Sequence, residues 1–254
     1  MNLLEVQNVC KSFGGLLAVN EVSFEVPANS IVGLIGPNGA GKTTVFNLIT
    51  GNYRPDRGKI FFANQDITGL APHKIVELGI ARTFQTIRLF ANLSVLENVL
   101  AGCHCRMRAG TLACMFKPKW QKQEEAQGIK QALAELSFVG LEKERENKAK
   151  NLSYGQQRLL EIARALASHP KLLILDEPAG GMNEQETKEL IDLIYKIQQR
   201  NVTVLLIEHD MSLVMQVCEK IVVLEYGTKI AEGEPKEIQN NPKVIEAYLG
   251  SDED

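Results

Sequence analysis

Residues 36–44 read Gly36-Pro37-Asn38-Gly39-Ala40-Gly41-Lys42-Thr43-Thr44, directly after the apolar run Ile31-Val32-Gly33-Leu34-Ile35. The spacing fits G-x-x-x-x-G-K-[ST], a pattern that needs a strand before it and a helix after it. Glycines let successive backbone N–H groups turn around an anion, and a helix that starts near Lys42 directs its positive end to the same point. The alternative is a glycine-rich turn with a chance lysine. The apolar residues 45–49 that follow favour a phosphate loop, so we expect a nucleoside triphosphate site.

Composition narrows the class of protein. The 254 residues are 44% hydrophobic and 23% charged, which allows a folded domain with a sizeable core. A net charge of −3 does not favour nucleic acid as the main partner. The apolar runs are shorter than a membrane span, and we see no secretory signal. The five cysteines are expected to be reduced, and Cys103-His104-Cys105 lacks the C-x-x-C spacing of a metal site.

Two kinds of strand are expected. Short strands at 3–6, 22–26 and 59–63 should form an antiparallel sheet beside the main core. Near-continuous apolar strands at 31–35, 172–175 and 202–207 precede helical patterns at 42–48, at 185–200 and from about 211. Such alternation predicts an α/β fold with a parallel sheet covered on both faces.

Residues of about 90–150 differ from this pattern, because they are rich in helix formers. We expect a helical insertion there. Its irregular basic segment, from Met107 to Lys122, is open to two interpretations: a surface loop in solvent, which we favour, or a face toward membrane headgroups or a partner. The acidic end, 251–254, is expected to fray.

A second phosphate element is expected at Leu172-Leu173-Ile174-Leu175-Asp176-Glu177. A carboxylate at the end of a buried parallel strand lies beside a phosphate loop, so Asp176 is positioned to hold Mg²⁺. Glu177 follows where an attacking water must be polarised. The alternative, a strand-end carboxylate that caps the next helix, leaves the second acid unexplained.

A third element is Leu152-Ser153-Tyr154-Gly155-Gln156-Gln157, which opens a helical pattern. A serine at a helix start followed by glycine makes a second anion site of hydroxyl and amide groups. One triphosphate scarcely needs two such sites from the same subunit.

These elements, with Gln85 before them and His209 after them, occur in the order and spacing of ABC-transporter ATPase subunits, which the chain resembles over nearly its whole length. The resemblance implies a P-loop NTPase parallel sheet with an antiparallel β subdomain and a helical insertion, in one domain over 1–254. The implied parts are a core and β subdomain at about 1–87 and 157–232, a helical subdomain at about 88–156 and a helical extension at about 233–254.

The resemblance also implies roles for individual residues. Phe13 would stack on adenine, unless it is a core aromatic, and Gly36 to Thr44 would hold the phosphates. Thr43, Gln85 and Asp176 would bind Mg²⁺. Glu177 would be the general base, with Lys42, Gln85 and His209 as further catalytic groups. Ser153, Gly155 and Gln156 would close on the ATP of a second subunit, in a head-to-tail homodimer or heterodimer.

Two residues depart from the family pattern. Tyr154 stands where glycine is commoner in the signature. Asn183 stands where many relatives carry aspartate, in the loop that couples the two sites. Asparagine keeps a hydrogen-bonding side chain without the charge, so coupling through that loop is an open question.

Several segments resemble LivG-type ATPases of bacterial branched-chain amino acid importers: 13–19, 82–90, 208–215 and 241–250. This implies transmembrane permease subunits, indirectly a periplasmic binding protein, and a peripheral location on the cytoplasmic face of the inner membrane. Arg88, Leu89 and Phe90 would line a groove for a permease helix. The alternatives are an importer of urea, short amides or other amino acids, a nonhydrolysing regulatory subunit, and a soluble ABC ATPase of DNA repair or translation.

Overall fold

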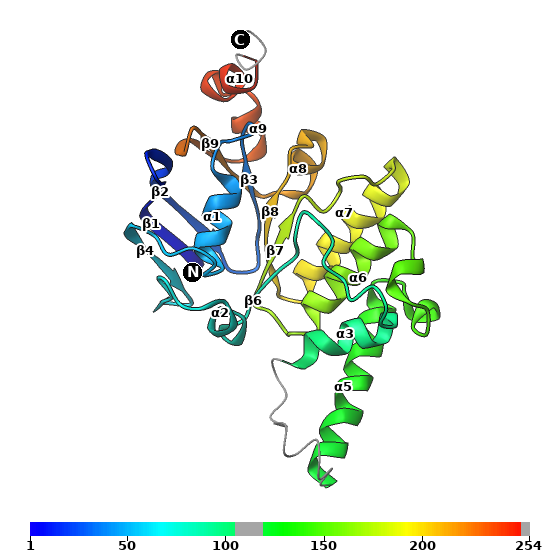
Figure 1. Cartoon of the computed structure of the whole chain (residues 1–254). Helices are drawn as coiled ribbons and strands as arrows, with labels where there is room; N and C mark the ends of the chain where they lie inside the picture. The colour runs from blue at the N-terminus through cyan, green and yellow to red at the C-terminus, as the bar shows by residue number, and fades with distance from the viewer. Residues whose placement is uncertain (105–118, 250–254) are drawn as a thin grey trace.

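A six-stranded sheet lies at the centre of the structure, a computed structural model that describes residues 1–104 and 119–249 (Figure 1). Five strands run parallel, and β10 pairs antiparallel with β9 at one edge. The spatial order is β10 (Thr228–Gly233), β9 (Lys220–Glu225), β3 (Ile31–Ile35), β8 (Thr203–Ile207), β7 (Leu172–Asp176) and β6 (Ile80–Arg82). The predicted parallel sheet is therefore confirmed. Most of the basic segment, residues 107–118, lies outside the described residues, as do Cys105 and Cys114.

The second sheet is antiparallel, as predicted, and its strands extend beyond the predicted short segments. Its order is β2 (Leu16–Pro27), β1 (Asn2–Phe13), β4 (Arg57–Phe62) and β5 (Gln65–Asp66). Leu4, Val6 and Val9 of β1 are buried, while Gln7 and Asn8 are exposed. One face of this sheet therefore packs on the core and the other meets solvent.

Side chains of β3 alternate between two apolar cores, so both faces of the central sheet are covered. Ile31 and Ile35 join the core made with the helices, and Val32 and Leu34 join the core made with the antiparallel sheet. The first core takes in α3 (Val95–Cys103), α5 (Lys119–Phe138), α6 (Tyr154–Leu166), α7 (Glu184–Gln199) and α8 (Met211–Val217). The second includes α1 (Lys42–Ile49) and α2 (Pro72–Leu78).

The helical insertion is built from α3, α5 and α6, which pack against one another to one side of the sheet (Figure 1). Short 3₁₀ turns at Glu142–Glu144 and Ala149–Asn151 connect α5 to α6. The expected boundary at 156 falls within α6, so the helix does not mark a limit there. The subdomain limits stay a prediction. The chain continues into α9 (Pro235–Gln239) and α10 (Pro242–Leu249). Within residues 1–104 and 119–249, no helix is long and apolar enough to span a membrane.

Candidate nucleotide site

The phosphate loop connects the end of β3 to the start of α1. Three of its glycines have left-handed backbone angles, with φ of 149° at Gly36, 79° at Gly39 and 97° at Gly41. A Cβ at Gly36 would lie 2.1 Å from the carbonyl oxygen of Leu224, so that position also needs glycine for close approach of β9. The loop therefore has the backbone geometry that the motif predicts.

Lys42 lies within the loop at the start of α1. Its side chain is buried, and Nζ donates hydrogen bonds to the carbonyls of Gly36 at 2.6 Å and Pro37 at 2.9 Å. Burial lowers the pKa of the ammonium, while the nearby charges of Glu177 and Asp176 raise it. The loop thus encloses a positive charge beside two carboxylates.

Asp176, the last residue of β7, forms a buried ion pair that sequence reasoning missed. Its Oδ2 lies 2.7 Å from Nη2 of Arg82, the last residue of the neighbouring strand β6. Arg82 also donates to Asn47 of α1 at 2.7 Å, and its guanidinium lies over Phe84 at 5.2 Å. Arg82 therefore holds the carboxylate against α1. No strand was predicted at 80–82, so the pairing of β6 with β7, which brings Arg82 to Asp176, required the structure.

Glu177, Gln85 and His209 meet beyond the ends of β7 and β8. Gln85 Nε2 donates to Glu177 Oε2 at 2.8 Å, and His209 Nδ1 lies 4.0 Å from Glu177 Oε1. Glu177 has φ of 47°, and its backbone N–H is bound to the carbonyl of Ile207 at 3.0 Å. Three residues predicted from separate parts of the chain are thus brought together.

The buried Glu208 carboxylate holds the backbone at His209. It is 1% exposed, and its carboxylate accepts backbone N–H groups from Ala179 at 3.0 Å and His209 at 3.1 Å. Burial raises the pKa of this carboxyl, and the backbone donors oppose the shift. Glu208 therefore ties the loop after Glu177 to the segment that carries His209.

A cavity of about 490 Å³ opens over the phosphate loop. Lys42, Thr43, Gln85 and Glu177 line it together with Phe13, Leu16, Leu17, Ala18, Asn38, Gly39, Ala40, Gly41, Thr44, Tyr226 and Gly227. Phe13 is 42% exposed, and its ring packs edge-on against Tyr53 at 5.1 Å between centroids, so it is not a core aromatic. The aliphatic wall of Leu16 and Leu17 and the ring of Tyr226 were not predicted, because β2 and the turn after β9 reach the loop only in the fold.

An adjoining cavity of about 340 Å³ shares Thr43 and Gln85 and adds Asp176. These three side chains offer hydroxyl, amide and carboxylate oxygens, the hard ligands that suit Mg²⁺. Among the described residues, no group of three or more His, Cys, Asp or Glu could hold a metal by itself. The donor set at this cavity therefore fits a cation held jointly with phosphate oxygens.

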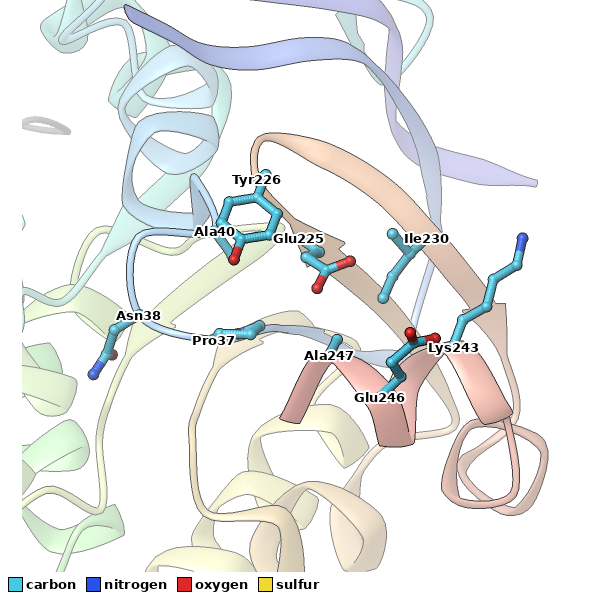
Figure 2. Close-up of a pocket in the computed structure, with 9 residues that line it drawn as sticks. All are labelled: Pro37, Asn38, Ala40, Glu225, Tyr226, Ile230, Lys243, Glu246 and Ala247. Carbon is cyan, nitrogen blue, oxygen red and sulfur yellow. The ribbon is translucent and has the colours of Figure 1, made fainter. Parts of the chain in front are cut away.

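Another cavity of about 430 Å³ lies between the loop and α10, with Pro37 and Ala247 in its lining (Figure 2). Glu225, Glu246 and Lys243 are among its lining residues, and the Lys243 ammonium points away from the Glu225 carboxylate (Figure 2). Two carboxylates with no ammonium directed between them do not suit a triphosphate, so the cavity over Lys42 is the better nucleotide site.

The signature residues lie apart from that cavity, since none of Ser153, Gly155 and Gln156 lines it. Ser153 is the N-cap of α6: its hydroxyl accepts the backbone N–H of Gln156 at 3.3 Å, and Gln156 Oε1 accepts that of Ser153 at 3.0 Å. The chain thus presents two separate helix starts, α1 at the loop and α6 at the signature.

Comparison with known proteins decides the family. The family model described as ABC transporter matches residues 19–180. The chain belongs to the ABC transporter family. A second model, Branched-chain amino acid ATP-binding cassette transporter, matches residues 228–254.

Similar proteins cover almost the whole chain. The high-affinity branched-chain amino acid transport ATP-binding protein LivG of Escherichia coli K12 is 46% identical, over 98% of both chains. BraF of Pseudomonas aeruginosa, which carries the same description, is 47% identical, also over 98% of both. An ABC ATP-binding cassette solved in its ADP conformation has a TM-score of 0.86 at 36% identity, over 98% of this chain and 99% of that one. The predicted ABC ATPase fold, ATP hydrolysis and nucleotide binding are thereby confirmed.

The two departures from the ABC pattern both have structural partners. The Tyr154 hydroxyl accepts a 2.9 Å hydrogen bond from Arg158. Asn183 is the N-cap of α7, where its Oδ1 accepts the N–H of Glu186 at 3.0 Å. Glu186 also faces the signature, since a Cβ at Gly155 would lie 2.4 Å from Glu186 Oε1. The first turn of α7 and the signature are therefore in contact within one ABC subunit.

Proposed function

We propose that this chain is the ATP-hydrolysing subunit of a bacterial importer of branched-chain amino acids. The observation that carries the proposal is the meeting of Gln85, Glu177 and His209, of which Gln85 and Glu177 line the cavity over the phosphate loop. The high identity to LivG and BraF supports the choice of cargo. Branched-chain cargo would reach the permease from a periplasmic binding protein, while this subunit stays peripheral on the cytoplasmic face of the inner membrane.

ATP would lie along the cavity from Phe13 to Lys42. Phe13 lines the cavity, is 42% exposed and would stack on adenine. The amides of Gly39 and Gly41 and the N-terminus of α1 would hold the β- and γ-phosphates, and the Lys42 ammonium would turn from loop carbonyls to phosphate oxygens.

Thr43, Gln85 and Asp176 would hold Mg²⁺, which neutralises charge on the phosphates when bound. Arg82 has the geometry to hold the Asp176 carboxylate in place, because the two side chains form a buried ion pair at 2.7 Å. Glu177 would accept the proton of the attacking water. Gln85 and His209, on either side of the carboxylate, would orient that water and the γ-phosphate.

The signature would complete the site of a second ABC subunit. Ser153, Gly155 and Gln156 lie outside the cavity of their own subunit, so a head-to-tail dimer gives them a nucleotide. A bacterial ABC transporter cassette solved as a dimer, with a TM-score of 0.78 at 26% identity over 91% of this chain and 98% of that one, supports this arrangement. The second subunit would be another copy or a sister ATPase.

Arg88, Leu89 and Phe90 would form the permease contact. The buried Asn98 side chain binds both the N–H of Phe90 at 2.9 Å and its carbonyl at 3.1 Å, so the backbone is fixed. The Phe90 ring is nevertheless 52% exposed. A rigidly held, exposed aromatic suits an anchor for a permease helix. No role for nucleic acid follows from these contacts.

The experiment is uptake by the assembled transporter. The chain, co-purified with its membrane partners and placed in vesicles, should import leucine in an ATP-dependent way when the co-purifying binding protein is added. Import of urea or a short amide without leucine import would overturn the assignment of branched-chain amino acids as the cargo. A purified complex that lacks a permease would overturn the transporter role.

A further inference from the structure

Arg158 of α6 is the centre of a buried polar bridge between the signature helix and segment 83–90. Its side chain is 4% exposed. Nη1 donates to the carbonyl of Phe84 at 2.7 Å, while Nη2 donates to the carbonyl of Gln85 and, at 2.9 Å, to the Tyr154 hydroxyl. Because a buried guanidinium requires acceptors, these bonds tie the backbone at Gln85 to α6.

Tyr154 makes two contacts that a glycine at this signature position would lack. Its hydroxyl and ring both face Arg158, with 5.3 Å from the guanidinium carbon to the ring centroid. Its ring also faces Gly181, where a Cβ would lie 2.9 Å from Tyr154 Cε1. Gly181 belongs to the loop that follows Glu177. Tyr154 is therefore in contact with the loop after Glu177 and, through Arg158, is connected to segment 83–90.

Gln85 connects this bridge to the reacting groups. Its carbonyl is held by Arg158, and its side-chain amide binds the Glu177 carboxylate at 2.8 Å. We propose that Tyr154 and Arg158 are positioning residues that set the Gln85 amide against Glu177 of the same subunit. They thereby link the signature end of each subunit to its own phosphate loop.

This inference rests on the proposed head-to-tail dimer, in which the two ends of one subunit serve two different nucleotides. When the signature of one subunit closes on the ATP of its partner, the position of Tyr154 would change. Through Arg158, that change would reach the Gln85 amide at the nucleotide site of Tyr154's own subunit. Loss of the hydroxyl should lower kcat about three- to tenfold, within the usual range of coupling between sites. The KM for ATP should stay the same, because Tyr154 is not in the cavity over the loop.

The first test is a double-mutant cycle on single-turnover ATP hydrolysis, with Tyr154→Phe and Gln85→Ala alone and combined. If Tyr154 acts through Gln85, Tyr154→Phe slows the wild type and adds nothing in the Gln85→Ala background. Equal slowing in both backgrounds, or no slowing in the wild type, would overturn the proposal. Arg158→Lys, which keeps the charge but loses the planar fork, should slow hydrolysis at least as much. Tyr195→Phe is the control: its hydroxyl binds the carbonyl of Gln216 at 2.6 Å, away from the bridge.

The second test uses two full copies joined in tandem, one of them carrying Glu177→Gln so that a single site works. Tyr154→Phe in the copy that keeps Glu177 should slow that site, even though its signature faces the silent one. If Tyr154→Phe slowed the working site only when placed in the Glu177→Gln copy, the inference would be contradicted. Ser153→Arg should block the working site from the Glu177→Gln copy. If it blocked from the copy that keeps Glu177 instead, the composite dimer, and with it the proposed function, would fail.

Discussion

The side-chain amide of Gln85 donates a 2.8 Å hydrogen bond to the carboxylate of Glu177, which lies 92 positions later in the sequence. The contact exists because β6 and β7 are parallel neighbours, so the residues after both strands emerge at the same edge of the sheet. Gln85 belongs to the segment held by α6, and Glu177 follows the strand beside the phosphate loop. These hydrogen bonds therefore connect α6 of the helical insertion to the proposed general base.

Glu177→Gln should bind ATP but lose hydrolysis by at least about a hundredfold, because a carboxamide does not accept the proton of the attacking water. The closed dimer should therefore persist with ATP. Size-exclusion chromatography and phosphate release measure the two effects. Rapid turnover by the purified variant would remove Glu177 from this role.

Lys42→Met should abolish ATP binding yet melt at the same temperature as the wild type, or a few degrees higher, at pH 7. Burial lowers the pKa of the Lys42 ammonium, so its charge costs folding free energy below the folded-state pKa. That cost disappears as the pH rises through the folded-state pKa toward the unfolded value of about 10.4. The difference in Tm should accordingly narrow at high pH. A Tm clearly below wild type at pH 7 would contradict the prediction.

Arg82→Met should destabilise the chain by about 3–5 kcal/mol, because it leaves the Asp176 carboxylate buried without its partner. Urea denaturation measures the free energy of unfolding. Lys74→Met is the matched control: it removes an exposed pair with Glu77 at 2.8 Å and should change little. Equal effects of the two substitutions would show that the Arg82 pair has no special importance.

Phe90→Ala should lower amino acid uptake by the assembled transporter several-fold, while ATP hydrolysis by the isolated subunit stays near wild type. The ratio of cargo moved to ATP hydrolysed, measured in vesicles, checks the loss of coupling. Ile245→Ala removes a similarly exposed apolar side chain on α10 and serves as the control. Unchanged transport by Phe90→Ala would mean that the permease contact lies elsewhere.

The sequence predicted those parts of the molecule whose chemistry depends on local spacing. The phosphate loop, the buried strands 172–175 and 202–207 and the helix starts follow from glycine spacing, apolar runs and caps, and the structure has them within one or two residues. Gln85 and His209 came from the family resemblance, and their placement beside Glu177 agrees with it.

Contacts between distant segments were not predictable in the same way. Strands β5 and β6 were missed because they are short, and β10 because it has the half-buried pattern of an edge. Strand β9 was missed although its buried apolar run is a local signal. In the sequence, Arg82 and Arg158 do not differ from other charged residues. Their acceptors are brought to them only by the sheet order and by the packing of α6. Tyr154 was visible only as a departure from a motif, since its partners are a buried arginine and a glycine 27 positions away.

The most direct test of the account mixes two inactive variants, Lys42→Ala and Ser153→Arg, as full-length subunits. In a composite homodimer, the mixed pair has one intact site, formed by the phosphate loop of the Ser153→Arg subunit and the signature of the Lys42→Ala subunit. Random pairing of equal amounts should restore about a quarter of the wild-type ATPase rate, since half of the dimers are mixed and each mixed dimer has one of its two sites intact. A mixture that forms dimers yet stays as inactive as its components would contradict the composite site.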